Sequence, residues 1–135
     1  MERLDKAELS RSRLDRALKF LKAAINNAEI GDYLTTANRS YYAVYSAIRA
    51  LLILEHNEMT KHVGNISEFR RLYIKSGVFK PEYSKYIDSL FETRHCSDYD
   101  SMFIVSKDEV LVQLEHAKEI VNKIAEYLAS RYNSK

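Results

Sequence analysis

Residues 34–55 read LTTANRSYYAVYSAIRALLILE, and this stretch decides the fold. Its apolar residues recur at alternating steps of three and four, the spacing that places side chains on one face of an α-helix. The pattern breaks at a glutamate, so we expect the helix to end near His56, and Asp32 stands where a capping side chain would close its first turn. The stripe consists of Leu34, Ala37, Tyr41, Val44, Ile48, Leu51 and Glu55.

The segments on either side of this stretch predict two further helices. One covers residues 4–29 and ends at Gly31, which suits a left-handed helix cap. Residues 56–65 predict a loop, with Asn57, Gly64 and Asn65 as breakers, and a shorter helix follows and stops near Gly77. The first helix carries Leu14, Leu18, Leu21, Ile25 and Ala28, and the shorter one carries Ile66, Phe69, Leu72 and Tyr73.

The C-terminal half of the chain predicts two more helices. Pro81 suits the first helical position, and the stripe behind it ends on a charged residue. Residues 95–105 predict a loop, after which Ser106 and Glu109 form a capping box that marks the start of the last helix. The two stripes are Tyr83, Ile87, Leu90 and Arg94, and then Val110, Leu114, Ala117, Val121, Ile124 and Leu128.

These elements predict an all-α fold. Three long and two short helices with short connections form a five-helix, mostly antiparallel (up-and-down) bundle, and residues 1–135 form a single domain. Three glycines and one proline are too few for the turns of an all-β sandwich or barrel.

Composition and charge narrow the class of protein. The single cysteine excludes an intramolecular disulfide, and without a long apolar run or a signal peptide we expect a cytoplasmic protein with no membrane contact. The net charge of +2 conceals a contrast, because residues 61–85 carry six basic and two acidic side chains whereas residues 86–115 carry two and seven. Such patches are either solvated helix faces or the basic surface of a nucleic-acid binder.

Cofactor and metal sites are not expected. The three glycines stand apart, so no phosphate-binding loop is present, and one cysteine with four histidines lacks the paired spacing of zinc ligands. His95 beside Cys96 does not form a catalytic pair, because adjacent residues on a helix point apart. We expect Cys96 to be an inert small side chain.

Arg94 is the most informative charged residue. Its place on an apolar stripe predicts a guanidinium at the edge of the bundle, where a partner must offset desolvation. Asp98 lies one turn further on, if the helix continues, and Tyr99 follows it. The pair is either a structural bridge that holds the following loop or part of a binding site, and both roles are compatible.

A second set of polar residues lies on the central helix. Arg39, Tyr42 and Ser46 share a face at positions i, i+3 and i+7, away from the core position Tyr41. An arginine beside aromatic rings is either buried and stacked or suited to the phosphates and bases of RNA. The Lys61-His62 pair adds a cation and a group that titrates near neutrality, as a phosphate contact or a general base.

Together these residues resemble the HEPN domains (higher eukaryotes and prokaryotes nucleotide-binding), and most closely their short, stand-alone prokaryotic subgroup. The resemblance rests on NRSYYAVYSAIRALL at residues 38–52, on Lys61-His62, and on Arg94 followed by Asp98-Tyr99, and it covers about residues 10–130. It implies a five-helix bundle that commonly forms homodimers. It also implies RNA-directed biology, often as the toxin of a pair whose antitoxin is a small nucleotidyltransferase.

Active HEPN ribonucleases carry an arginine and, after four to six residues, a histidine, and they cleave RNA without a metal across a dimer. Arg94 matches that arginine, but Tyr99, Asp100 and Ser101 occupy the matching histidine positions, so the motif is broken. Arg49 and His56 have the required spacing at a different place in the chain, and we interpret this match as coincidence.

Three hypotheses follow. The first is a dimeric module beside a nucleotidyltransferase partner, binding RNA or nucleotide through Arg39, Tyr42, Lys61, His62, Arg94, Asp98 and Tyr99. Arg39 and Arg94 would contact phosphate, and Tyr99 would be a target for modification by the partner. The second is a metal-independent endoribonuclease in which His62 or His95 replaces the missing histidine and acts with Arg94. The third is a structural dimerisation domain without a nucleotide site.

Overall fold

A computed structural model describes residues 3–56, 62–100 and 102–133, and it confirms the all-α fold with five α-helices. No β-strand occurs within these ranges. The helices are α1 (Arg3–Glu29), α2 (Tyr33–Glu55), α3 (His62–Phe69), α4 (Glu82–Tyr99) and α5 (Lys107–Tyr132), and a π-helical turn, η1 (Arg70–Ile74), follows α3 directly.

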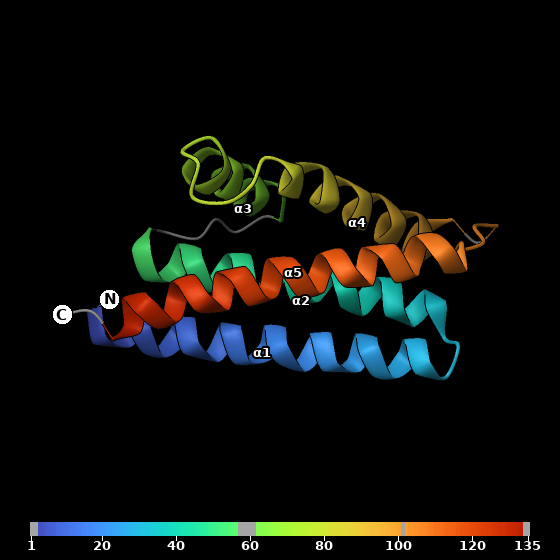
Figure 1. The fold of residues 1–135 in the computed structure, drawn as a ribbon, viewed down its shortest axis with the longest axis horizontal. Coiled ribbons are helices and arrows are strands. Elements are labelled where there is room, and N and C mark those ends of the chain that lie inside the picture. Colours follow the sequence, from blue (N-terminus) through green and yellow to red (C-terminus); the bar gives the residue numbers. More distant parts are fainter. Residues whose placement is uncertain (1–2, 57–61, 101, 134–135) are drawn as a thin grey trace.

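Helix α2 is the centre of the bundle. Among the described residues it packs against each of the other four α-helices, whereas α1 packs only against α2 and α5. Figure 1 shows α1 on one side of α2 and α5, with α3 and α4 on the opposite side. The beginning of α1 and the end of α5 lie at the same end of the molecule (Figure 1).

The sequence of α2 explains this central place. Thirteen of its 23 residues are buried, which is more than one face can supply. Ala43, Ala47 and Ala50 are fully buried, and their small side chains let neighbouring helices approach closely. The larger Tyr41 and Ile48 fill the space between these contacts. Residues 34–55, which form most of α2, are therefore the centre of the hydrophobic core.

The predicted ends of several helices are confirmed. The Asp32 carboxylate accepts a hydrogen bond of 3.1 Å from the Thr35 backbone N–H at the start of α2. Gly31 and Gly77 have φ angles of 79° and 86°, a left-handed conformation that favours glycine. Ser106 Oγ accepts from the Glu109 backbone N–H at 3.3 Å and opens α5.

The predicted loop over residues 56–65 is wrong at its C-terminal end. Helix α3 begins at His62, so Gly64 and Asn65 are helical, while Asn57 lies outside the described residues. Asn65 is buried, and its amide donates a 2.8 Å hydrogen bond to the hydroxyl of Tyr45 on α2. This tertiary bond outweighs the weak helix propensity of asparagine, which local sequence reasoning weighs alone.

The predicted loop over residues 95–105 is also wrong at its beginning. Helix α4 continues to Tyr99, and Asp100 ends it. Contacts one helical turn apart join the extra turn to the one before it, including a 2.7 Å bond from Ser97 Oγ to the Thr93 carbonyl. Arg94, Asp98 and Tyr99 therefore lie on one continuous helix.

Two members of the predicted stripes are exposed. Leu18 and Leu34 keep 43% and 48% of their surface, so neither belongs to the core. On α1 the buried line runs instead through small side chains at Ser10, Ala17 and Ala24, together with Leu21. Helix α1 lies so close to α2 that small residues face it, which a search for large apolar residues overlooks.

Candidate functional site

Arg94 lies in a cage of aromatic rings. Only 8% of the residue is exposed, and its guanidinium carbon is 4.7 Å from the ring centre of Tyr41, 5.4 Å from that of Phe91 and 5.7 Å from that of Tyr42. Phe91 lies one turn before Arg94 on α4, and the two tyrosines come from α2. Stacked arginine and aromatic rings attract each other, because the face of each ring carries negative charge.

The surroundings of Arg94 stabilise its charged form. One guanidinium nitrogen lies 3.4 Å from a carboxylate oxygen of Asp98, and the two residues are four positions apart on α4. Burial acts to lower the pKa of Arg94, but Tyr42, Tyr41 and Asp98 outweigh it, and the pKa is raised. Burial also raises the pKa of Tyr41 to about 12, so this tyrosine stays neutral beside the cation at pH 7.

The predicted Arg94–Asp98 pair is thus present, and its geometry suits the structural role, while the binding role stays a prediction. The pair joins the last turn of α4 to the core through the ring of Tyr41. Asp98 lies at the edge, where its side chain is 35% exposed, so the cluster also faces solvent on one side. A buried polar group remains within it, because Arg94 Nε has no hydrogen-bond partner among the described residues.

His95 and Tyr99 lie beside this cluster on the surface. Their ring centres are 4.8 Å apart, and the ring of His95 is 6.1 Å from that of Phe91, which also contacts Arg94. His95 is exposed, and Tyr99 keeps 72% of its surface. The side chain in the family's histidine region is therefore an accessible phenol next to an accessible imidazole.

Arg39 and Tyr42 connect α2 to α1. The guanidinium of Arg39 is 5.9 Å from the ring centre of Phe20, and that ring is 5.8 Å from the ring of Tyr42. Arg39 also donates to the side-chain oxygen of Asn38 at 2.5 Å. Because Tyr42 also faces Arg94, two aromatic rings stand between the two arginines. The structure links Arg39 and Arg94 in this way and does not place them in direct contact.

The Lys61-His62 pair remains a prediction. Lys61 lies outside the described residues, and His62 is described only as the first residue of α3. A binding site that His62 shares with Arg39 and Arg94 therefore stays a prediction.

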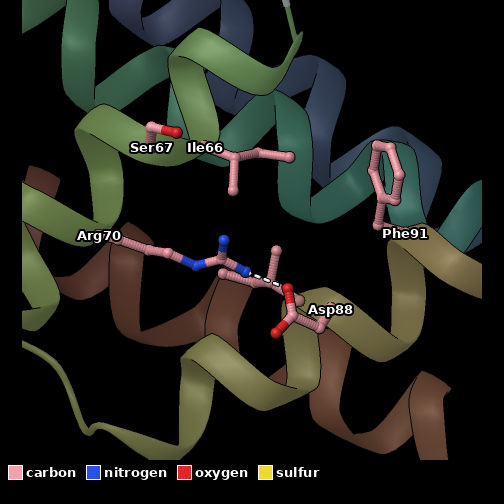
Figure 2. A pocket seen from close by; sticks show the side chains of 6 residues that line it. Ile66, Ser67, Arg70, Asp88 and Phe91 are labelled. Atoms are coloured by element: carbon pink, nitrogen blue, oxygen red, sulfur yellow. Dashed lines mark hydrogen bonds and ion pairs between the residues drawn. The ribbon is translucent and has the colours of Figure 1, made fainter.

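Sequence reasoning did not identify a cavity between α3 and α4. It has a volume of about 160 Å³ and contains Arg70, whose guanidinium forms an ion pair with Asp88 and donates to the Ser84 carbonyl at 3.3 Å. Figure 2 shows this guanidinium held toward Asp88, with Phe91 at the side of the cavity. The lining residues are Ile66, Ser67, Arg70, Ile87, Asp88 and Phe91.

Several basic residues of the segment 61–85 form ion pairs within the fold. Arg70 pairs with Asp88, and Arg71 pairs with Glu68 at 2.7 Å. Lys80 pairs with Glu119 at 2.9 Å. Three of the six basic side chains of this segment are therefore paired with carboxylates of the same fold.

Metal and thiol chemistry find no support in the described residues. Within ranges 3–56, 62–100 and 102–133, no group of three or more histidine, cysteine, aspartate or glutamate side chains is arranged to hold a metal. Burial, together with Glu92 and Asp100, raises the pKa of Cys96, so its thiol stays protonated near neutral pH. None of the helices in the described part of the chain is long and apolar enough to span a membrane.

Residues 10–128 match the HEPN domain. Several known proteins are also similar in sequence over most of the chain. "Putative toxin MJ0142" of Methanocaldococcus jannaschii is 30% identical over 133 residues, which cover 97% of this chain and 88% of that protein. A "UPF0332 protein" of Archaeoglobus fulgidus is 29% identical over 120 residues, 89% of this chain and 93% of that protein. The bundle centred on α2, with a caged Arg94 before Asp98 and Tyr99, therefore belongs to the HEPN domain family.

Proposed function

We propose that this chain is a toxin-type HEPN module that binds RNA or nucleotide as a homodimer and has weak or no ribonuclease activity of its own. The observation that carries the proposal is the state of Arg94. This arginine matches the family's catalytic arginine, yet its guanidinium is buried among three rings and bonded to Asp98. The similarity to proteins whose printed names describe toxins supports the toxin-type assignment.

Binding without efficient cleavage follows from this geometry. A caged guanidinium keeps its charge, but it has little freedom to follow a phosphate through a reaction. Proton transfer needs a titratable group in reach of the 2′-hydroxyl, and Tyr99 and Asp100 stand where an imidazole would be. Tyr42 and Tyr99 add ring surfaces on which bases stack.

The test combines binding and cleavage on the same purified protein. We expect fluorescence anisotropy to detect binding of a labelled single-stranded RNA, and gel analysis in EDTA to show little or no cleavage. Tyr42→Leu removes a stacking ring while preserving an apolar contact, and we expect at least threefold weaker binding. Leu18→Gln is the matched surface control on α1, since Leu18 is exposed and outside the core. Absence of RNA and mononucleotide binding by the wild type would refute the proposal.

An endoribonuclease is the second candidate, favoured by one observation. His95 directly follows Arg94, and both side chains contact Phe91. In a dimer, His95 of one protomer would act on RNA held by its partner. If RNA is cleaved in EDTA, His95→Ala should abolish cleavage and leave binding unchanged. Cleavage that persists in both His95→Ala and His62→Ala would remove both histidines from the reaction.

A nucleotidyltransferase partner is the further part of the proposal. The hydroxyl of Tyr99 is the proposed acceptor for a nucleotidyl group, because 72% of the residue is exposed at the end of α4. Incubation with such an enzyme and ATP should add the mass of AMP to the wild type and leave Tyr99→Phe unchanged. Analytical ultracentrifugation of the chain alone tests the homodimer, and a monomer at micromolar concentration would contradict that part.

A further inference from the structure

The cavity between α3 and α4 combines an apolar wall with polar side chains at one side. Its volume is about 160 Å³. A pocket of this kind, apolar with a few convergent polar groups, is the usual form of a small-molecule site. The apolar wall consists of Ile66, Ile87 and Phe91, and the polar side consists of Ser67, Arg70 and Asp88.

Arg70 keeps hydrogen-bond donors that the fold does not use. One terminal nitrogen of its guanidinium donates to Asp88 and to the Ser84 carbonyl, the latter at 3.3 Å. Figure 2 shows the other terminal nitrogen directed into the open space toward Ile66. This nitrogen forms no hydrogen bond with the described residues, and the buried Nε also has no partner among them. A molecule in the cavity would therefore meet N–H groups that are free to donate.

Asp88 provides an acceptor beside these donors. One of its carboxylate oxygens accepts from Arg70, whereas the other has no hydrogen-bond partner among the described residues. The side chain of Asp88 is 70% exposed, so the carboxylate lies at the rim of the cavity. Donor and acceptor thus stand next to each other, held in place by their own ion pair (Figure 2).

The ion pair also decides the charge of the molecule that the cavity suits. Arg70 and Asp88 are the charged members of the lining, and their charges cancel. A phosphate or carboxylate would be repelled by Asp88, and a cation would be repelled by Arg70. A neutral molecule that accepts from the arginine and donates to the aspartate avoids both repulsions.

The size and the wall of the cavity indicate one flat ring. An apolar protein cavity of about 150 Å³ holds a benzene molecule, and this cavity has about 160 Å³. Phe91 stands at its side, where an aromatic ring can stack on another ring or meet it edge to face (Figure 2). A single six-membered ring therefore fits better than the two fused rings of a purine.

Among the bases of RNA, cytosine has the matching edge. Its ring nitrogen and carbonyl oxygen are adjacent acceptors for the N–H groups of Arg70, and its amino group is a donor for Asp88. Carboxylates accept from this amino group in base recognition. Uracil carries a carbonyl in place of the amino group, and that oxygen would face the carboxylate without a hydrogen bond.

We infer that the α3–α4 cavity is a subsite for one cytosine base of a single-stranded RNA, recognised by Arg70 and Asp88. The inference deepens the proposed RNA-binding function and rests on it. The base lies beside the Arg94 cluster, because Phe91 lines the cavity and its ring centre is 5.4 Å from the guanidinium carbon of Arg94. Unstacked RNA bases are commonly bound in this way, by an aromatic ring and by hydrogen bonds to the pairing edge.

The first arm of the test uses cytidine as the probe on the full chain. NMR should show intermolecular NOEs between the cytosine ring protons and the methyl groups of Ile66 and Ile87. Uridine should bind with a Kd at least about threefold higher. Cytidine that gives NOEs only to other parts of the protein, or uridine that binds equally well, would overturn the subsite.

Two variants test the cavity and its base recognition separately. Ser67→Tyr adds a ring at the exposed rim of the cavity and should abolish the cytidine NOEs. Ser130→Tyr makes the same change at an exposed position on α5 outside the cavity, and it should leave them intact. Asp88→Asn keeps an oxygen for Arg70 but adds an amide donor that suits uracil, so the preference for cytidine should disappear.

The second arm compares labelled oligocytidine and oligouridine of equal length by fluorescence anisotropy. The wild type and Ser130→Tyr should bind oligocytidine at least about threefold more tightly, and Ser67→Tyr and Asp88→Asn should lose this difference. The two variants are measured at exposed positions, and circular dichroism confirms that each keeps the helical fold.

The outcomes separate this inference from the proposed function. Equal binding of the two oligonucleotides by the wild type overturns the cytosine subsite and leaves the proposed function standing. A preference that survives both Ser67→Tyr and Asp88→Asn overturns the subsite as well, because the base is then recognised elsewhere. A wild-type protein that binds neither RNA nor cytidine overturns the subsite and the proposed function together.

Discussion

Arg94 and the arginines between α1 and α2 lie in two different surroundings. Arg94 is enclosed by Tyr41, Tyr42 and Phe91 and paired with Asp98, all within the chain. Arg13, Arg16 and Arg49 line a cavity of about 160 Å³ between α1 and α2 together with two serines, and Arg16 is exposed to solvent. The comparison teaches that burial among rings makes an arginine part of the core, whereas an exposed arginine of the same bundle contributes little to its stability.

The largest effect that separates the two regions should be on stability. Arg94→Ala removes a buried cation and its contacts with three rings, and we expect it to lower the free energy of unfolding by about 3 kcal/mol. Arg16→Ala, at an exposed position, should change it by less than about 0.5 kcal/mol. Urea denaturation of both variants measures the contrast, and equal losses would mean that the comparison is wrong.

A second charged group, on the surface, gives an independent measure of the same principle. The Glu55 carboxylate accepts hydrogen bonds from Tyr73 at 2.6 Å and Tyr127 at 2.8 Å, and it pairs with Arg131 at 3.1 Å. Burial acts to raise the pKa of Glu55, but these three partners outweigh it and lower the pKa. Because solvent reaches Glu55 and screens its charge, Glu55→Gln should cost about 1 kcal/mol at pH 7.

The pH dependence of that cost follows from the direction of the shift. A lowered pKa in the folded protein stabilises it fully above the unfolded value of about 4.3, and the contribution is lost as the pH falls through the folded pKa. The difference between wild type and Glu55→Gln should therefore shrink on acidification. A difference that stays constant down to acid pH would show that the carboxylate's charge is not what the cluster stabilises.

The smallest effect concerns the edge of the Arg94 cluster. Asp98→Asn should lower the free energy of unfolding by about 0.5 kcal/mol, because the Asp98 side chain is 35% exposed and solvent screens the pair. The three rings would still hold the guanidinium. Urea denaturation at low and high salt checks this, and a loss as large as that of Arg94→Ala would show that the carboxylate, and not the rings, holds the arginine.

Local sequence patterns were sufficient for much of the fold. The stripes of α2 and α5 placed most of the core correctly, and the caps at Asp32 and Ser106 located the starts of both helices. They failed where a long-range contact decided the outcome. Asn65 is helical because it bonds to Tyr45, twenty residues earlier, and such a bond leaves no mark in the neighbouring sequence.

The same distinction between local patterns and long-range contacts applies to the candidate site. The place of Arg94 on an apolar stripe predicted a buried cation that needs a partner, and its spacing to Asp98 predicted the pair that the structure shows. The rings that complete the cage could not be predicted, because Tyr41 and Tyr42 come from a different helix. Arg49 was interpreted through its spacing to His56, whereas in the structure its guanidinium carbon lies 6.0 Å from the ring centre of Tyr45.

The sequence by itself determined the all-α fold, the family and the broken Arg-to-His motif, because helical periodicity and residue order are properties of neighbours along the chain. Only the tertiary structure decided which charges are enclosed and which face a cavity. That choice depends on which helix faces which: α4 brings Arg94 to the rings of α2, and α1 brings Arg13 and Arg16 to Arg49. Packing, and not residue type, therefore gives the arginines of this protein their different surroundings.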